Sequence, residues 1–372
     1  MQLKHLEHNF IDEKSWDHNL TNFPHSNFLH SYKWMKYISE FDNVVSNKSF
    51  FLTNSEGEVV AFCPLIVYRL SYESNEYLSI GSNSQYTIGF PLVQSKTSSM
   101  RKKIFKYIFN YYFSFALENG IKVMETVSHP LTKTFCNRET NYMDKFFEPI
   151  KYKNFDRVTN TSVVDLSNSV EFLERNLGKY HRRHIRRTEK KGIVFEAIDC
   201  NTEENIVEKS FKNFQEAHFI SAGKSTRPQQ TWDTMKEMLV KDKAVLFVAK
   251  IKNIVVSYLL CGKFRNMSWG WSQVNVEEYE KEYSPRHFLE WKSILYLKEL
   301  GYQFYEIGDI VYYPSPFYIP SKKELSISMF KERYGASLLP KVYWTLFFDN
   351  DLCLDMSKQK TSKFINSFIS NE

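Results

Sequence analysis

The sequence predicts a mixed α/β fold built from two similar halves. Segments with a helical pattern of apolar residues alternate with short β-branched and aromatic runs along the chain of 372 residues, of which 42% are hydrophobic. Gly120 and Glu125, at the passage from a helical pattern into a strand-like run, recur with the same spacing as Gly301 and Glu306. A chain of this length and composition can bury a substantial core.

Turn residues and apolar runs define the elements of the first half. The runs 49–52 and 59–68 flank the turn Ser55–Glu58, which predicts a β-hairpin. The apolar stretch Ile104–Leu117 predicts a buried core helix. In order, the sequence predicts a helix over 31–40, strands over 49–53, 59–69 and 76–80, a helix over 98–118, a strand over 121–126, a helical stretch near 131–147 and a strand over 158–165.

The second half has one helix with clear boundaries. Ser284 can cap it, Pro285 suits the first helical position, and Gly301 stands just beyond its end. The predicted order is a strand over 193–198, helices over 202–219 and 228–240, strands over 244–249, 254–264 and 267–273, the helix 285–300, a strand over 302–307, a short helix near 323–333 and a strand over 341–348. We therefore expect a first domain over 1–166, a connector over 167–192 and a second domain over 193–372.

Composition excludes several classes of protein. The 49 Lys and Arg residues against 43 Asp and Glu residues give a net charge of +6, too small for a dedicated nucleic-acid binder, so any anion site must be local. No apolar run approaches the ~20 residues that span a bilayer. Five scattered cysteines without paired spacing predict a reduced, cytoplasmic protein without disulfides or structural zinc, and the metal prediction is none.

Motif searches narrow the chemistry. The sequence has no Gly-x-Ser-x-Gly elbow, no His-Glu-x-x-His, no phosphate loop ending in Gly-Lys-Ser/Thr and no Gly-x-Gly-x-x-Gly. These absences disfavour serine hydrolases, zincins, P-loop proteins and Rossmann dehydrogenases.

The strongest local signal is a basic segment over 179–192. Seven cations stand in thirteen residues: Lys179, Arg182, Arg183, Arg186, Arg187, Lys190 and Lys191. On a helix they form two adjacent stripes, and like charges at that spacing repel unless anions lie opposite. Two interpretations remain open: a solvated linker helix with Glu189 as a partner, or a clamp for phosphates, whose oxygens match guanidinium groups.

This segment and three others resemble the Fem-type aminoacyltransferases that build peptidoglycan cross-bridges. The segments are Asn27–Trp34, Arg182–Gly192, Leu289–Asp309 and Ile327–Gly335, and they occur in the family's order. The resemblance extends to polysaccharide-cluster N-acyltransferases of the GNAT superfamily. It implies two GNAT-like units packed together that transfer an acyl or aminoacyl group to an amine of a cell-envelope precursor, either an amino sugar or a lipid-linked peptide.

The donor is left open by two departures from the family pattern. GNAT enzymes that use acetyl-CoA usually carry a glycine-rich loop before the long helix, whereas Tyr279–Arg286 has no glycine, and Gly81–Gly89 is wrongly spaced. The long helical hairpin with which Fem-type enzymes often hold tRNA is also missing. We expect no permanently bound cofactor and a co-substrate that is acyl-CoA, aminoacyl-tRNA or an acyl carrier protein, held by Lys179, Arg182, Arg183, Arg186, Lys190 and Arg286.

Acyl transfer to an amine needs a proton acceptor, a polarised carbonyl and a proton for the leaving group. Glu306 lies in the predicted second-half strand, and Asp309 follows it. Either carboxylate could accept the amine proton. His287 could protonate the leaving group. Each also has an ordinary structural explanation, as a strand-end carboxylate or a solvated histidine at a helix start.

Aromatic residues gather near the same part of the sequence. Trp269 and Trp271 share one face of a predicted strand, and the period of two extends that face to Gln273. They are either core residues or the lining of a sugar or peptide groove. The proline-rich segment Val311–Pro320 is a candidate lid or acceptor-binding loop. The full set of candidate substrate-binding residues is Trp269, Trp271, Gln273, Tyr283, Tyr313, Lys331 and Arg333.

A different functional class also fits the basic segment. A non-catalytic protein could grip RNA or an anionic lipid surface with residues 179–191, and its binding would be sensitive to salt. Peripheral membrane contact is compatible with either class.

Overall fold

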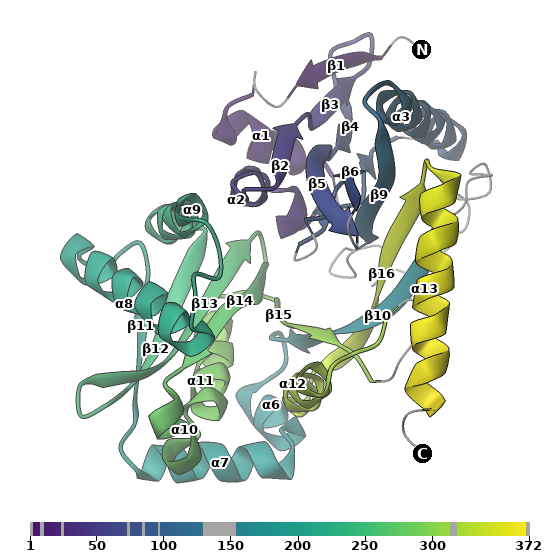
Figure 1. The fold of residues 1–372 in the computed structure, drawn as a ribbon. Coiled ribbons are helices and arrows are strands. Elements are labelled where there is room, and N and C mark those ends of the chain that lie inside the picture. The colour runs from purple at the N-terminus through teal and green to yellow at the C-terminus, as the bar shows by residue number, and fades with distance from the viewer. Residues whose placement is uncertain are drawn as a thin grey trace. The chain divides into compact units, whose positions relative to one another are not determined.

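A computed structural model describes residues 3–7, 11–23, 26–72, 75–83, 86–95, 97–128, 154–312 and 318–369. The helical stretch predicted near 131–147 lies outside these residues. The contacts within the chain divide it into two compact units. Unit 1 contains 1–159, 313–320 and 340–372, and unit 2 contains 160–312 and 321–339 (Figure 1).

Unit 1 contains two groups of paired strands. β1 (Lys4–Glu7), β3 (Phe50–Thr53), β4 (Val59–Cys63) and β8 (Leu92–Val93) pair in that order, and β9 (Ile121–Ser128) is followed in strand order by β6 (Asn75–Ile80), β5 (Ile66–Tyr72) and β2 (Val44–Asn47). Its helices are α1 (Glu13–Leu20), η2 (Phe28–His30), α2 (Tyr32–Ile38), α3 (Ser98–Glu118) and α13 (Asn350–Ile369). The strand predicted over 59–69 is two strands, because Pro64 between them has no N–H to donate.

Unit 2 is one sheet with helices on both faces. Its strands run in the order β11 (Val194–Ile198), β12 (Ala244–Ile251), β13 (Ile254–Phe264), β14 (Met267–Asn275), β15 (Phe304–Ile310) and β10 (Asn154–Asp165). Its helices are α6 (Val170–Asn176), α7 (Lys179–Lys190), α8 (Glu204–Ala222), α9 (Gln229–Val240), α10 (Glu277–Tyr283), α11 (Pro285–Glu299) and α12 (Lys322–Glu332).

The two halves repeat one arrangement, as predicted. In unit 1 a hairpin leads through α3 into β9, which runs parallel to β6. In unit 2 a hairpin leads through α11 into β15, which runs parallel to β14. Gly120 and Gly301 follow the two helices with φ of 65° and 83°, left-handed values that glycine adopts without strain. The matched glycines therefore mark the same turn.

The contact-defined units differ from the predicted linear boundaries at the C-terminus. β16 (Ser337–Phe347) pairs with β9 through residues Val342–Phe347, and this pairing places most of the strand in unit 1. β10 likewise contributes its first residues to unit 1 and its last residues to unit 2. A single domain boundary at residue 166 cannot describe this arrangement, because β16 comes late in the chain and pairs with β9, which comes much earlier.

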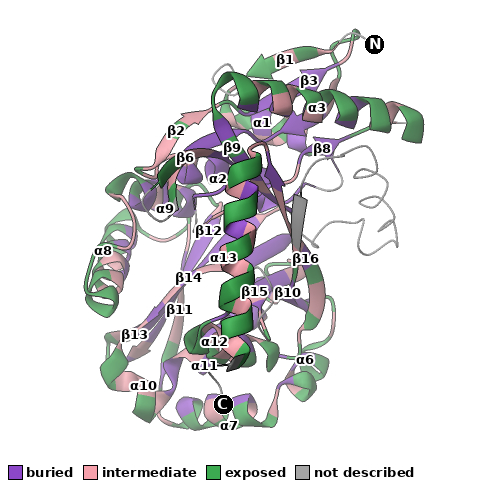
Figure 2. Ribbon diagram, turned by 45° about the vertical axis from the view of Figure 1, so that its right-hand side comes forward, coloured by how far each residue is buried: buried purple, intermediate pink, exposed green. Residues whose placement is uncertain are grey.

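The core of unit 2 lies between α11 and the sheet. Phe288, Trp291, Ile294 and Leu297 on α11 are at most 6% exposed and pack against β12 and β13, whose residues are almost all buried (Figure 2). Burial of each such side chain contributes about 1.5–3 kcal/mol. This packing holds the first turn of α11 in place relative to the strands.

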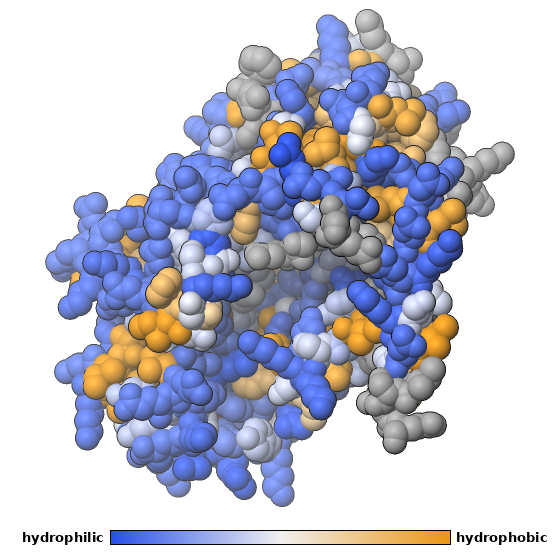
Figure 3. Space-filling view, in the orientation of Figure 1, coloured by the Kyte–Doolittle hydropathy of each residue, from blue (hydrophilic) through white to orange (hydrophobic). Residues whose placement is uncertain are grey.

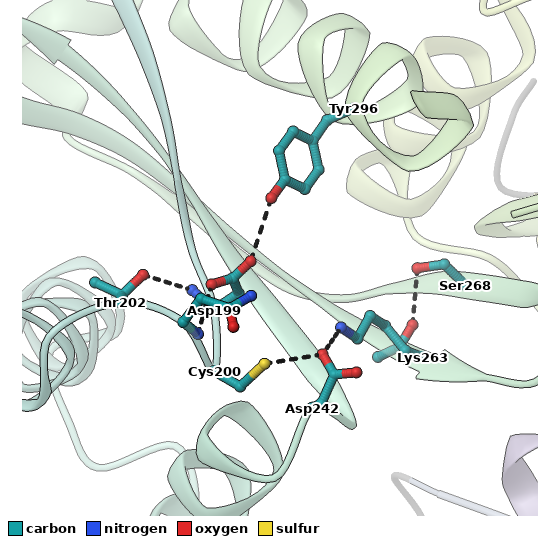
Figure 4. Close-up of polar contacts among 9 residues, drawn as sticks. Asp199, Cys200, Thr202, Asp242, Lys263, Ser268 and Tyr296 are labelled. Atoms are coloured by element: carbon teal, nitrogen blue, oxygen red, sulfur yellow. Dashed lines mark hydrogen bonds and ion pairs between the residues drawn. The ribbon is translucent and has the colours of Figure 1, made fainter. Parts of the chain in front are cut away.

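Polar contacts stabilise the end of the unit 2 sheet that lies away from the first turn of α11 (Figure 4). Asp242, in the left-handed turn before β12, accepts a hydrogen bond from Lys263 on β13 and one of 3.3 Å from the Cys200 thiol. Tyr296 on α11 donates to Asp199 over 3.3 Å. Partial desolvation and the neighbouring Asp242 raise the pKa of the exposed Cys200 thiol, which disfavours its thiolate form.

Candidate functional site

The strands β14 and β15 pair only at their beginnings. Hydrogen bonding between them covers Met267–Trp269 on β14 and Phe304–Glu306 on β15. β14 then continues to Asn275 paired only with β13. The two strands therefore form a fork, in which the peptide groups of β14 on the β15 side have no strand partner and can accept a ligand.

The matching position in unit 1 is closed. β6 and β9 also pair through three residues of β6, Leu78–Ile80, but the short strand β7 (Ile88–Gly89) then pairs with Thr126 and Val127 of β9. Within the described residues, no short strand pairs with β15 in the way that β7 pairs with β9. The open fork belongs to unit 2.

A β-bulge at Trp271 changes the faces of β14 beyond the fork. Gly270 lies opposite Cys261 on β13, whereas Ser272 lies opposite Leu260, so Trp271 is the extra residue. Trp269 and Ser272 consequently share the face opposite α11, and Gln273 faces α11. The predicted common face of Trp269 and Gln273 is wrong, because the bulge breaks the period of two.

A second bulge aligns two carboxylates on β15. Glu306 lies opposite Val163 on β10 and Gly308 lies opposite Ser162, which makes Ile307 the extra residue. Glu306 and Asp309 therefore share one face, although a regular strand would separate them. Glu306 is 3% exposed and accepts a hydrogen bond of 2.6 Å from the Thr161 hydroxyl.

Lys331 on α12 covers the other face of the same bulge. Its ammonium donates to the Asp309 carbonyl oxygen over 3.3 Å, and a Cβ atom at Gly308 would lie 2.5 Å from Lys331 Nζ. Gly308 also has a φ of 122°, which other residues rarely adopt. Burial lowers the pKa of Lys331, while the charges of Asp309 and Glu306 oppose the shift. The side chain is a cation held close to both carboxylates.

A buried acid that sequence reasoning missed lies at the base of the fork. Glu290 on α11 is 2% exposed and accepts a hydrogen bond of 2.6 Å from the Tyr305 hydroxyl. Burial raises the pKa of Glu290. A Cβ atom at Gly270 would lie 2.9 Å from the same hydroxyl, so any larger residue there would have to displace it. The available sequence signal was a glutamate inside the apolar face of α11.

A second missed group lies on the opposite face, beside the bulge of β14. The Ser272 hydroxyl is 3.0 Å from His218 Nε2 on α8 and 3.4 Å from the Arg227 guanidinium. Arg227 lies 4.6 Å from the centre of the Trp232 ring. Burial lowers the pKa of His218 to about 4, with Arg227 adding to the shift. This corner presents a serine, a neutral imidazole and a cation together.

Three histidine rings meet at the start of α11. His181 and His184 on α7 have ring centres 4.7 and 4.8 Å from that of His287. Neither ring nitrogen of His287 has a hydrogen-bond partner among the described residues. Burial lowers its pKa to about 3, and the charges of neighbouring histidines and Arg286 lower it further. His287 is therefore neutral at pH 7, which does not suit the predicted role of proton donor.

The basic helix α7 packs one face on α11 and exposes its cations. His181, Ile185 and Thr188 on that face are buried. The surface over α7 is covered by hydrophilic side chains (Figure 3). Arg186 pairs with Glu174 at 2.8 Å, and within the described parts of the chain no ion pair involves the remaining candidate cations Lys179, Arg182, Arg183 and Lys190.

The junction between α10 and α11 replaces a glycine loop. Ser284 takes a left-handed conformation with φ of 49° and caps α11 by position only, because its hydroxyl is hydrogen-bonded to His184 Nδ1 at 2.7 Å. Arg286 lies 3.9 Å from the centre of the Phe330 ring. Tyr283 contacts Lys191, whose ammonium is 4.7 Å from its ring centre. Side chains of α7 and α12 thus surround this helix start.

The structure brings seven of the predicted residues into two groups within unit 2. Trp269, Glu306, Asp309 and Lys331 lie at the fork, and Arg286, His287 and Arg333 lie between α7, α11 and α12, where Arg333 is 5.6 Å from the Tyr180 ring centre. Tyr313 lies outside the described residues. Among those that are described, no group of three or more His, Cys, Asp or Glu side chains could hold a metal, and no helix is long and apolar enough to cross a membrane.

Comparison with solved structures gives the fold a name. FemX matches with a TM-score of 0.60 and 14% identity over 92% of this chain and 97% of that one. L-PGS from Bacillus licheniformis matches with 0.57 and 13%, over 94% and 96%. A tandem GNAT protein from the clavulanic acid pathway matches with 0.50 and 10%, over 93% and 99%. No protein-family model and no curated protein matches the chain.

These likenesses cover nearly the whole of each chain. The protein has the Fem-like tandem GNAT fold, as the sequence predicted, with two units of related topology. At identities of 14% or less they establish the fold, and the chemistry must be argued from this chain's own residues.

We predict that Gly270→Ala will destabilise the protein by about 1–3 kcal/mol, because the new methyl group forces the Tyr305 hydroxyl from its position. Urea unfolding measures the change. Tyr305→Phe removes the obstructing oxygen, so Gly270→Ala should cost much less in that background. Equal losses in both backgrounds would rule out this packing at the fork.

Acidification is expected to weaken the fold through His181 and His287. Their folded pKa values of about 4 and about 3 lie below the unfolded value, so the unfolded chain binds protons first and stability falls as the pH drops below about 6.5. Each contributes up to about 2 kcal/mol of loss at pH 5. In urea unfolding at pH 7.5 and 5.0, His287→Asn should reduce the loss and the exposed-site control His18→Asn should not. An unchanged loss in His287→Asn refutes the assignment.

Proposed function

We propose that the protein is an N-acyltransferase that moves an acyl or aminoacyl group to an amine of a cell-envelope or polysaccharide precursor. The observation that supports this most directly is the open fork in unit 2, with Glu306, Asp309 and Lys331 beside it and a closed counterpart in unit 1. The tandem GNAT fold of FemX and L-PGS agrees with acyl transfer in general.

The fork supplies the groups that direct transfer requires. The amine nitrogen attacks the donor carbonyl carbon, the bond from that carbon to the sulfur or oxygen of the leaving group breaks, and the amine loses one proton. Glu306 or Asp309 accepts this proton, directly or through water. The N–H groups of β14 that point toward β15 beyond the last residue paired with it, together with the nearby Lys331 ammonium, suit a developing oxyanion. The same carboxyl group, directly or through water, then passes that proton to the sulfur or oxygen, which departs as a thiol or hydroxyl.

The donor is held mainly by side chains. Pro285 removes one N–H from the first turn of α11, and the Ser284 hydroxyl is engaged by His184, so the backbone there offers little to a pyrophosphate. The exposed cations of α7 lie next to this helix start and can bind phosphates in its place. Acyl-CoA and aminoacyl-tRNA both present such phosphates, and we propose one of them as the co-substrate.

The acceptor meets the face that carries Glu306 and Asp309. Trp269 lies on that face, as does the corner of Ser272, His218 and Arg227. A flat ring covers the apolar face of a sugar, and a guanidinium binds an acidic substituent. An amino sugar or a lipid-linked peptide satisfies both, and a cytoplasmic location is part of this proposal.

Mass spectrometry of acceptor mixtures tests the transferase directly. A UDP-linked amino sugar and a lipid-linked peptide are each incubated with acetyl-CoA and, separately, with an aminoacylated tRNA mixture. A new adduct with the mass of the acyl or aminoacyl group supports the proposal and identifies the donor. Tight, salt-sensitive RNA binding without any adduct in the four mixtures would instead favour a polyanion-binding protein.

Glu306→Gln and Asp309→Asn are expected to lower kcat by about 10²–10⁴-fold for whichever residue accepts the proton, because the amide cannot take it up. The pH profile should lose its acidic limb in that variant, which a purely structural defect would not cause. In Glu306→Gln the Thr161 hydroxyl can still donate to the new side-chain amide oxygen, so the local hydrogen bond is kept. Two variants that both retain wild-type kcat would contradict the assignment.

The combined variant Arg182→Gln, Arg186→Gln and Lys190→Gln is expected to raise the donor KM at least about tenfold at low salt, because it removes three phosphate-binding charges. The difference should shrink in about 300 mM salt as screening weakens the wild-type contact. Lys209→Gln, Lys212→Gln and Lys224→Gln remove the same charge from exposed positions on or just after α8 and serve as the control. Equal donor KM values in the two triple variants would contradict a role for α7.

A further inference from the structure

Arg157 in unit 1 is held between two tyrosine rings. Its guanidinium carbon lies 4.4 Å from the centre of the Tyr318 ring and 4.3 Å from that of the Tyr343 ring. Arg157 belongs to β10, Tyr343 to the neighbouring β16, and Tyr318 to the segment that precedes α12. Two rings on opposite or adjoining sides of a planar cation restrict its orientation before any ligand arrives.

This cation has no acidic partner among the residues that the structure describes. Neither a hydrogen bond nor an ion pair joins Arg157 to a carboxylate there, and its side chain is only partly exposed. A guanidinium keeps its charge at any physiological pH and carries five N–H donors in one plane. The tyrosine rings contact its faces, so these in-plane donors are the part left for another molecule.

Further positive charges surround Arg157. Lys341 is 9% exposed, and its ammonium lies 5.7 Å from the centre of the same Tyr343 ring. Lys360 on α13 lies within electrostatic range of Arg157. Burial lowers the pKa of Lys360, and the positive charges of Arg157 and Lys363 lower it further, whereas the negative charge of Glu125 raises it. Among the described residues whose charges act on Lys360, the cations Arg157 and Lys363 outnumber the carboxylate Glu125, an arrangement that favours a ligand with more than one negative charge.

We infer that Arg157, Lys341 and Lys360 form a phosphate-binding site on unit 1, with Tyr318 and Tyr343 holding the guanidinium for bidentate contact. A phosphate monoester or pyrophosphate fits the charge and the planar fork better than a single carboxylate does. The assignment of this site to the acceptor rests on the proposed function. On that basis, the site binds the phosphate of a nucleotide-linked or lipid-linked acceptor.

Titration of the full chain with inorganic pyrophosphate by isothermal calorimetry tests the site without any turnover. Arg157→Gln should weaken binding at least about tenfold, and Arg157→Lys should weaken it less, because lysine keeps the charge and loses the fork. Arg175→Gln is the matched control: it removes an exposed arginine that lies 5.8 Å from the centre of one aromatic ring, Phe172, in unit 2. Its affinity should stay within about twofold of the wild type.

Two further comparisons separate the possible failures. The triple variant of α7 should retain the binding that Arg157→Gln removes, which distinguishes this site from the basic helix. Absence of pyrophosphate binding in the wild type, or wild-type affinity in Arg157→Gln, overturns the inference; if that variant does not fold, Arg157→Lys and Tyr318→Leu decide in the same way. Where turnover is found, Arg157→Gln should raise the acceptor KM and spare the donor KM. Where no donor gives turnover, the transferase proposal fails and the pyrophosphate titration still stands.

Discussion

The early end of hydrogen bonding between β14 and β15 is the constraint on which the candidate site depends. When two parallel strands stay paired, their peptide groups hydrogen-bond to each other and leave no room for a ligand. Here each strand carries a bulge near the point of parting, at Trp271 and at Ile307. The bulge at Ile307 places Glu306 and Asp309 on the same face. Chemistry at this place follows from backbone geometry before any side chain is considered.

Packing of α11 holds the fork in a fixed shape. The apolar face of the helix lies on β12 and β13, and its one buried acid, Glu290, meets the Tyr305 hydroxyl at the base of the opening. The same helix begins against α7, whose histidines fill the space next to His287. The proposed phosphate-binding surface of α7 and the base of the fork therefore both contact the first half of α11, so a donor that binds beside the start of this helix can reach the fork.

The sequence was sufficient for the doubled α/β arrangement and for the boundaries of the strongest elements. Ser284, Pro285 and Gly301 placed α11 almost to the residue, and the matched glycines showed the duplicated arrangement. The bulges could not be predicted from the sequence, because a pattern of period two assumes a regular strand. That assumption placed Gln273 on the wrong face of β14. Glu290 and His218 were missed for a related reason: each acquires its role from a partner distant in sequence, Tyr305 and Ser272.

We propose that the donor's acyl group enters the fork of unit 2 along β14. Hydrogen–deuterium exchange with whichever donor supports turnover tests it most directly, since the amides of Gly270–Asn275 that do not pair with β13 have no strand partner on the β15 side. We expect the donor to slow exchange in Gly270–Asn275 while leaving the matching strand β6 of unit 1 unchanged. Saturation with donor that leaves β14 exchange unaltered, or protects β6 instead, would contradict the claim.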